Sequence, residues 1–137
     1  MVESIGSNFT KAPNLSLRYN VSFTTQQDAS RPIDVKSVTH SPSINFDAYV
    51  WDSLTITSDF TFNEVRQNGN VANSFKIWNA KLAYRKDRDA KWEYELVGNN
   101  LLATGSQVNI SQSIIAFTVN ERFILPRFIS FRVRYQL

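Results

Sequence analysis

Apolar and polar residues alternate along most of this 137-residue chain, whereas the 3.6-residue periodicity of an amphipathic helix is almost absent. Alternation with a period of two is typical of β-strands that present one apolar and one polar face. The pattern predicts six strands, at Asn14–Thr24, Ser43–Val50, Leu54–Glu64, Ser74–Arg85, Lys91–Asn99 and Phe128–Leu137. We therefore expect an all-β fold, built as an antiparallel meander of about six amphipathic strands.

The predicted connections differ in length. Two of them are short, Trp51–Ser53 and Lys86–Ala90, and three are long and polar, Gln26–Pro42, Val65–Asn73 and Asn100–Arg127. Connections in a meander alternate between the two ends of the sheet, so both short turns fall at one end and the long loops at the other. This arrangement is typical of outer-membrane barrels, although a soluble sandwich can also show it.

Each short turn also predicts a strand register, because residues at equal distances from its centre face each other. The first turn, centred on Asp52, predicts three pairs: Val50 with Leu54, Ala48 with Ile56, and Asp47 with Thr57. The second turn, centred near Arg88, predicts three more: Tyr84 with Trp92, Leu82 with Tyr94, and Lys81 with Glu95. Both registers keep the apolar residues on one face and the polar residues on the other.

The polar face has two possible environments. It is the solvated face of a soluble sheet, or it lines the water-filled interior of a membrane barrel. The charged candidates for a lumen are Arg18, Asp47, Asp59, Lys81, Glu93, Glu95, Arg132 and Arg134. Aromatic residues gather near the predicted short-turn end, at Trp51, Tyr84, Trp92 and Tyr135. They form either an aromatic girdle at lipid headgroups or the polar-tipped edge of a soluble core.

The composition argues against several other functions. The chain has no Cys and a single histidine, His40, which disfavours a metal site or a Ser-His-Asp triad. The formal net charge of +3 is too small, and too evenly spread, to indicate nucleic-acid binding. The carboxylates alternate with Lys and Arg, which resembles a lumen-facing ladder more than a glycosidase pair. We expect neither an enzyme nor a cofactor.

Membrane topology raises the question of closure. No apolar run is long enough for a membrane-spanning helix, and the N-terminal residues do not resemble a signal peptide. Six strands are also fewer than the eight of the smallest familiar membrane barrels, and an open sheet in lipid would leave unpaired backbone groups at both edges. If the apolar face meets lipid, we expect residues 1–137 to be the C-terminal portion of a longer barrel whose signal peptide and plug are absent from this sequence.

Four segments carry a resemblance to a known family. They read "FTKAPNLSLRYN" from Phe9, "THSPSINFDAYVWDSLTITSDFTF" from Thr39, "WNAKLAYRKDRDAKWEYELVGNNLLAT" from Trp78 and "FILPRFISFRVRYQL" from Phe123. In order and spacing the chain resembles the C-terminal part of TonB-dependent-receptor-like outer-membrane β-barrel proteins, in the group with a carboxypeptidase-regulatory-like domain and a plug. The resemblance implies the end of a barrel of about 22 strands in the cell outer membrane. It also implies active uptake of a scarce substrate, namely a siderophore, cobalamin or a glycan.

The resemblance implies partners and roles as well. The partners are outer-membrane lipid, the barrel-assembly machinery, the rest of the barrel with its plug, and TonB through the N-terminal part. The last strand resembles an assembly signal with lipid-facing residues Ile129, Phe131, Val133, Tyr135 and Leu137, the last of which stands where Phe or Trp is usual. The candidates for substrate contact in the long loops are Arg31, His40, Arg66, Asn68 and Asn70. The alternative is a small soluble β-barrel or sandwich that binds an apolar ligand or a glycan.

Overall fold

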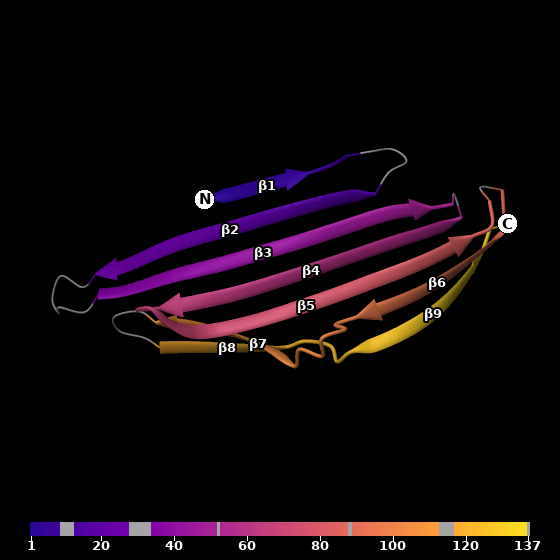
Figure 1. Cartoon of the computed structure of the whole chain (residues 1–137). Helices are drawn as coiled ribbons and strands as arrows, with labels where there is room; N and C mark the ends of the chain where they lie inside the picture. Colours follow the sequence, from indigo (N-terminus) through magenta and orange to yellow (C-terminus); the bar gives the residue numbers. More distant parts are fainter. Residues whose placement is uncertain (9–12, 28–33, 52, 88, 113–116, 137) are drawn as a thin grey trace.

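The computed structural model describes residues 1–8, 13–27, 34–51, 53–87, 89–112 and 117–136, and these residues form strands and turns (Figure 1). One large sheet dominates the fold, and a hairpin accompanies it. The described strands are β1 (Val2–Gly6), β2 (Asn14–Gln27), β3 (Asp34–Val50), β4 (Leu54–Gln67), β5 (Asn70–Arg85), β6 (Trp92–Asn99), β7 (Ser106–Gln112), β8 (Phe117–Phe123) and β9 (Phe128–Tyr135).

The large sheet is an open antiparallel meander of seven strands in the order β1-β2-β3-β4-β5-β6-β9. Strands β7 and β8 pair with each other, and this hairpin lies next to β5 in the segment between β6 and β9. The all-β meander is therefore confirmed. Strand β1 and the hairpin add to the six predicted strands, and the central strands are longer than predicted.

Two of the predicted loops are largely strand. The segment Gln26–Pro42 contributes the end of β2 and much of β3, where Val35 and Val38 are three residues apart and the apolar residues do not follow a period of two. The segment Val65–Asn73 contains a two-residue turn, in which Asn68 has φ 50° and Gly69 has φ 86°. Two successive positive φ angles match a type I′ hairpin turn, for which Asn-Gly is the preferred sequence. The long-loop prediction at this end of the sheet was therefore wrong for the β4–β5 connection.

The predicted registers had different outcomes. In the β3–β4 hairpin Val50 pairs with Leu54, Ala48 with Ile56 and Asp47 with Thr57, as predicted. The β5–β6 register was wrong by two residues, since Tyr84 pairs with Tyr94, Leu82 with Leu96 and Lys81 with Val97.

The structure of the second turn explains that error. The turn is centred one residue later, where Asp87 Oδ1 accepts a hydrogen bond from Asp89 N at 3.1 Å and Asp87 O accepts one from Ala90 N at 3.3 Å. Moving the centre by one residue moves each pairing by two, which leaves every side chain on its predicted face. Trp92 then extends beyond the β5 ladder and faces Tyr135 of β9.

The sheet has no second layer over its apolar face among the described residues. Ala48, at 6% exposure, is the one buried hydrophobic residue among those whose burial is described, whereas large apolar side chains on β2, β5, β6 and β9 are exposed. Burying such side chains against one another is what normally stabilises a soluble sheet. The described chain therefore presents a broad apolar surface that it does not itself cover.

Candidate functional site

The apolar face of the sheet is a band with clear upper and lower borders. On β4 the band runs from Leu54 through Ile56 and Phe60 to Phe62, and the next residues on the same face are Glu64 and Arg66. At about 3.3 Å per residue, Leu54 to Phe62 spans about 26 Å along the strand. Strands β2, β3 and β5 carry matching stretches, which are aligned by the ladder pairs. They contain Leu15, Leu17 and Tyr19; Ile44, Phe46 and Val50; and Trp78, Leu82 and Tyr84.

The four predicted girdle residues lie at the same end of the sheet, beside the two short turns. Trp51 is 87% exposed in the β3–β4 turn, where it has φ 54°. Tyr84 ends the apolar stretch of β5, and the rings of Trp92 and Tyr135 contact each other with centroids 4.8 Å apart. Ser53 ties the two turns together, because its Oγ donates to Lys86 O at 2.9 Å.

The opposite border of the band was not predicted. There Trp78 Nε1 donates to Ser58 Oγ at 2.9 Å, and Tyr19 Oη and His40 Nδ1 are hydrogen-bonded at 2.6 Å. Immediately beyond these rings the same face becomes charged, at Glu64 and Lys76. In the sequence, this border is marked only by a polar residue that interrupts each alternating segment. These polar residues line up as a border only when the strands are paired.

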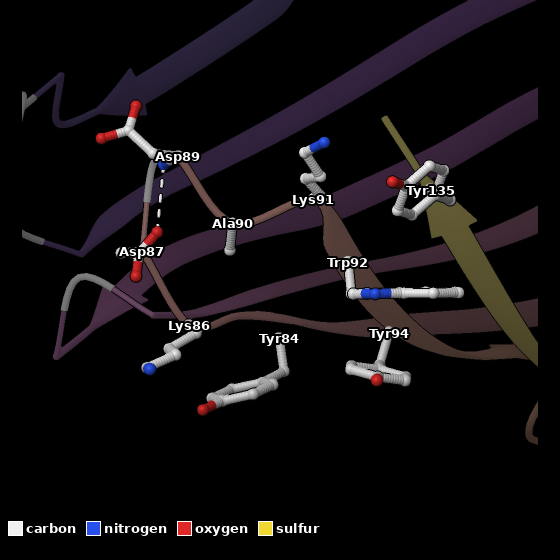
Figure 2. A pocket seen from close by; sticks show the side chains of 9 residues that line it. All are labelled: Tyr84, Lys86, Asp87, Asp89, Ala90, Lys91, Trp92, Tyr94 and Tyr135. Atoms are coloured by element: carbon white, nitrogen blue, oxygen red, sulfur yellow. Dashed lines mark hydrogen bonds between the residues drawn. The ribbon is translucent and has the colours of Figure 1, made fainter. Parts of the chain in front are cut away.

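A shallow groove lies at the short-turn end of the apolar face (Figure 2). Its floor is aromatic, with Tyr84 of β5, Trp92 and Tyr94 of β6 and Tyr135 of β9. Its rim is formed by the β5–β6 turn and carries both positively and negatively charged side chains. The rim residues are Lys86, Asp87, Asp89 and Lys91.

The polar face carries a network of hydrogen bonds and ion pairs. Asn79 Nδ2 donates to Asp59 Oδ2 at 2.7 Å. Arg134 lies 3.4 Å from Glu93 Oε1 and 3.1 Å from Glu95 Oε2. Glu95 is the most buried charged residue described, at 2% exposure, and its Oε2 has the ion pair with Arg134 but no well-directed hydrogen bond.

The other predicted lumen residues lie on this face but are not drawn into one cluster. Arg18 and Asp47 are exposed, and Lys81 sits opposite Val97 rather than Glu95, so the predicted Lys81–Glu95 pair is wrong. Arg132 stands opposite Glu95 in the ladder, yet the ion pair with Glu95 comes diagonally from Arg134.

The predicted loop residues are dispersed. His40 lies within β3 and Arg66 within β4, where its Nε is 2.6 Å from Glu64 Oε1, so neither is a loop residue. Asn68 forms the β4–β5 turn, where its Oδ1 accepts from Lys36 N at 3.0 Å, and Asn70 begins β5. Arg31 lies outside the described residues.

Strand β9 is an edge strand. It pairs with β6 on one side, and its other side has no partner strand among the residues that the structure describes. The predicted assembly-signal residues Ile129, Phe131, Val133 and Tyr135 are exposed on the apolar face, with the rings of Tyr94 and Phe131 stacked 6.3 Å apart. Leu137 lies outside the described residues.

Asn100 organises the bend that follows β6, a role that the alternation pattern did not reveal. Its side chain is 3% exposed and donates to Thr104 O at 2.7 Å and Leu125 O at 3.0 Å, while its Oδ1 accepts from Thr104 N at 2.9 Å. Leu101 N donates to Trp78 O at 2.8 Å, and Thr104 Oγ1 to Lys76 O, so the bend covers part of the β5 edge that β6 leaves free.

The described residues contain neither a candidate metal site nor a candidate membrane-spanning helix. No group of three or more His, Asp or Glu side chains is placed to hold a metal ion there. No helix in that part of the chain is long and apolar enough to cross a bilayer.

Comparisons with known proteins found no matching family, no matching curated protein and no matching solved structure.

Proposed function

We propose that the chain is a segment of an outer-membrane β-barrel, with its apolar face in lipid and its polar face towards an aqueous lumen. The observation that carries the proposal is the bounded apolar band. The span of about 26 Å on β4 becomes roughly 20 Å at a strand tilt of about 40°, close to the ~25 Å lipid-facing band of such barrels. One border is aromatic, and the other changes to Glu64 and Lys76.

The absence of a packed core in the described sheet supports the same proposal. A soluble sandwich buries its large inward side chains between two layers. Here Phe131 of β9 and Leu96 of β6 are 64% and 47% exposed, and Leu82 of β5 is exposed beside them. Lipid hydrocarbon would cover these side chains without a second protein layer.

We expect a larger barrel, because neither edge strand of the sheet has a second partner strand among the described residues. Unpaired backbone groups in hydrocarbon cost several kcal/mol each, so β1 and β9 both need neighbouring strands. The strand order makes β1 and β9 run in the same direction, because six antiparallel pairings separate them. Closure into a fully antiparallel barrel therefore requires an odd number of further strands between these two edges. The 22-stranded barrel that the resemblance implies satisfies this condition.

The transport function rests on the resemblance to TonB-dependent receptors. In this proposal the complete barrel imports a scarce substrate, and this segment supplies lipid-facing strands and part of the lumen wall. Of the residues expected to contact substrate, Arg66, Asn68 and Asn70 lie at the β4–β5 hairpin, at the opposite end of the sheet from the girdle. They are the first residues to vary when uptake is assayed.

Two adjacent positions test the lipid-facing orientation. Ile56 lies on the apolar face of β4 and Thr57 on the polar face, and the chain has no native Cys. The full reading frame that encodes the chain should be expressed in a Gram-negative host as Ile56→Cys and, separately, Thr57→Cys. We expect a small water-soluble maleimide to label Thr57→Cys in isolated outer membranes, and to label Ile56→Cys only after denaturation in detergent.

Other results of the same experiment would contradict the barrel proposal. Recovery of the protein in the soluble fraction, with both cysteines labelled or only Thr57→Cys labelled in water, would overturn the barrel proposal. Such a result would favour a soluble β-protein whose apolar face is covered by another layer.

A further inference from the structure

The pairing at the end of the chain is interrupted at one level on two strands. Strand β6 pairs with β9 as far as Asn99 opposite Phe128, and β7 pairs with β8 from Ser106 opposite Phe123. Figure 1 shows β7 and β8 beyond the ends of β6 and β9, alongside β5. Strands β6 and β7 are therefore two parts of one broken strand, and β8 and β9 are two parts of its partner.

The backbone within the break cannot continue either ladder. Residues 100–105 include Asn100 with φ 48° and Ala103 with φ 56°, whereas a β-strand requires a negative φ. Residues 124–127 include Pro126, which has no backbone N–H to donate to a ladder. Local conformation therefore fixes the position of the break, and the β7–β8 hairpin is joined to the large sheet through these two segments.

The break lies level with the border of the apolar band. Leu101 N donates to Trp78 O at 2.8 Å, and Thr104 Oγ1 donates to Lys76 O. Trp78 carries the ring at this border, and Lys76 is the first charged residue beyond it on β5. An unpaired backbone group is costly in hydrocarbon, but beyond the border water can pair with it. Lipid therefore requires the β5–β6 and β6–β9 ladders and makes no such demand on β7 and β8.

Beyond the border, the edge of β5 has no ladder on the side of β7. Strand β6 pairs with β5 only from Ala80 onward, and β7 lies beside the earlier part of β5 while its ladder is with β8 alone. Trp78 O and Lys76 O both point to this side, so the alternation of the backbone directs the N–H and C=O of Ser74 there as well. This edge offers β7 a set of backbone groups with which to pair.

We propose that the β7–β8 hairpin is a hinged flap that turns at residues 100–105 and 124–127. In its docked arrangement β7 pairs with the edge of β5 and continues the barrel wall beyond the lipid. In its undocked arrangement the hairpin leaves β5, and a lateral slot opens onto the polar face. A few terminal residues of an element are enough to absorb such a motion. The placement of the flap outside lipid rests on the proposed membrane function, whereas the hinge itself does not.

Distances between paired nitroxide labels test the hinge in the full reading frame, folded in detergent micelles. One label is placed at Lys36→Cys on β3 and the other at Glu121→Cys on β8, both at exposed positions. The control pair keeps Lys36→Cys and moves the second label to Arg132→Cys on β9, which the β6 ladder holds in place. Double electron–electron resonance should give two distance populations for the first pair and one for the control.

A variant assigns the two populations to the hinge. Asn100 bonds to both Thr104 and Leu125, and so ties the two connecting segments together. Asn100→Ala should therefore raise the ratio of undocked to docked hairpin by roughly threefold or more. Asn45→Ala makes the same substitution at an exposed position on β3 and should leave the ratio unchanged.

Two results would overturn the inference. One is a single Lys36–Glu121 distance in both the parent and Asn100→Ala, which would show that the hairpin is fixed. The other is equal broadening of the control pair, which would show that the whole sheet bends. Either result leaves the barrel proposal standing if Ile56→Cys and Thr57→Cys label as expected. Two Lys36–Glu121 distances without that labelling pattern would support the hinge and contradict its placement at a lipid border.

Discussion

Replacing Asn100 with alanine should destabilise the bend after β6 by about 4 kcal/mol. The variant loses the side-chain hydrogen bonds to Thr104 N, Thr104 O and Leu125 O, which are 2.7 to 3.0 Å long. At about 1 kcal/mol each, these bonds account for roughly 3 kcal/mol. Asn100 also has φ 48°, a left-handed conformation that costs alanine about 1 kcal/mol more than asparagine.

Amide hydrogen exchange measures this loss locally. The amides of Leu101 and Thr104 are both hydrogen-bonded in the bend. About 4 kcal/mol corresponds to exchange that is roughly a thousandfold faster when the bend opens independently of the sheet. The measurement is made on the full reading frame, folded in detergent micelles, and compared at matched pH and temperature.

Two further variants separate the causes. Asn100→Gly keeps the left-handed φ without strain but lacks the side chain, so it should lose about 3 kcal/mol rather than 4. Asn45→Ala, an exposed change on the polar face of β3, should stay within about 0.5 kcal/mol of the parent. Exchange at Thr104 that changes less than threefold in Asn100→Ala would refute the reasoning, because the bend would then be held by its backbone alone.

Three other changes have expected outcomes. Gly98→Ala should lower the urea midpoint, because its Cβ would lie 2.7 Å from Leu101 Cδ2, and adding Leu101→Ala should restore much of the loss. Gly69→Ala should cost about 1 kcal/mol at φ 86°, whereas Gly105→Ala, with no atom within 4 Å of its added Cβ, should be close to neutral in the same titration. Deleting residues 129–137 should abolish outer-membrane insertion, measured by heat-modifiable gel mobility, and normal surface display of the truncated protein would contradict this.

Short-range patterns predicted some features correctly for a simple reason. The side-chain period of a strand is two, so each residue's face follows from its position in an alternating run. The short β3–β4 turn leaves little freedom in pairing, and the register from Val50 to Leu54 was correct. The β5–β6 turn is longer, and the hydrogen bond from Asp89 N to Asp87 Oδ1 decides its centre. That bond was not evident from the alternation.

Other features were predicted wrongly, either because the apolar–polar alternation was weak or because a sequence signal was not used. The start of β3 is rich in Ser and Thr, and its strand character comes from pairing with β2 and β4 rather than from apolar residues. The Asn68–Gly69 dipeptide is a strong hairpin signal that could have shortened the predicted loop. Asn100 directly follows Asn99 and precedes Leu101 and Leu102, and the alternation pattern does not distinguish the two asparagines. Its role depends on Thr104 and Leu125, which it meets only in the folded bend.

The sequence by itself determined that this protein is a sheet with one apolar and one polar face, because alternation acts within each strand. The tertiary structure decided which strands pair and in which register. Strand β6 pairs with β9 across the β7–β8 hairpin, a choice made by backbone hydrogen bonds between distant segments. The β4–β5 pairing places Phe62 opposite Lys76, and the β6–β9 pairing places Trp92 opposite Tyr135, so that separate alternating runs become a bounded band and a groove.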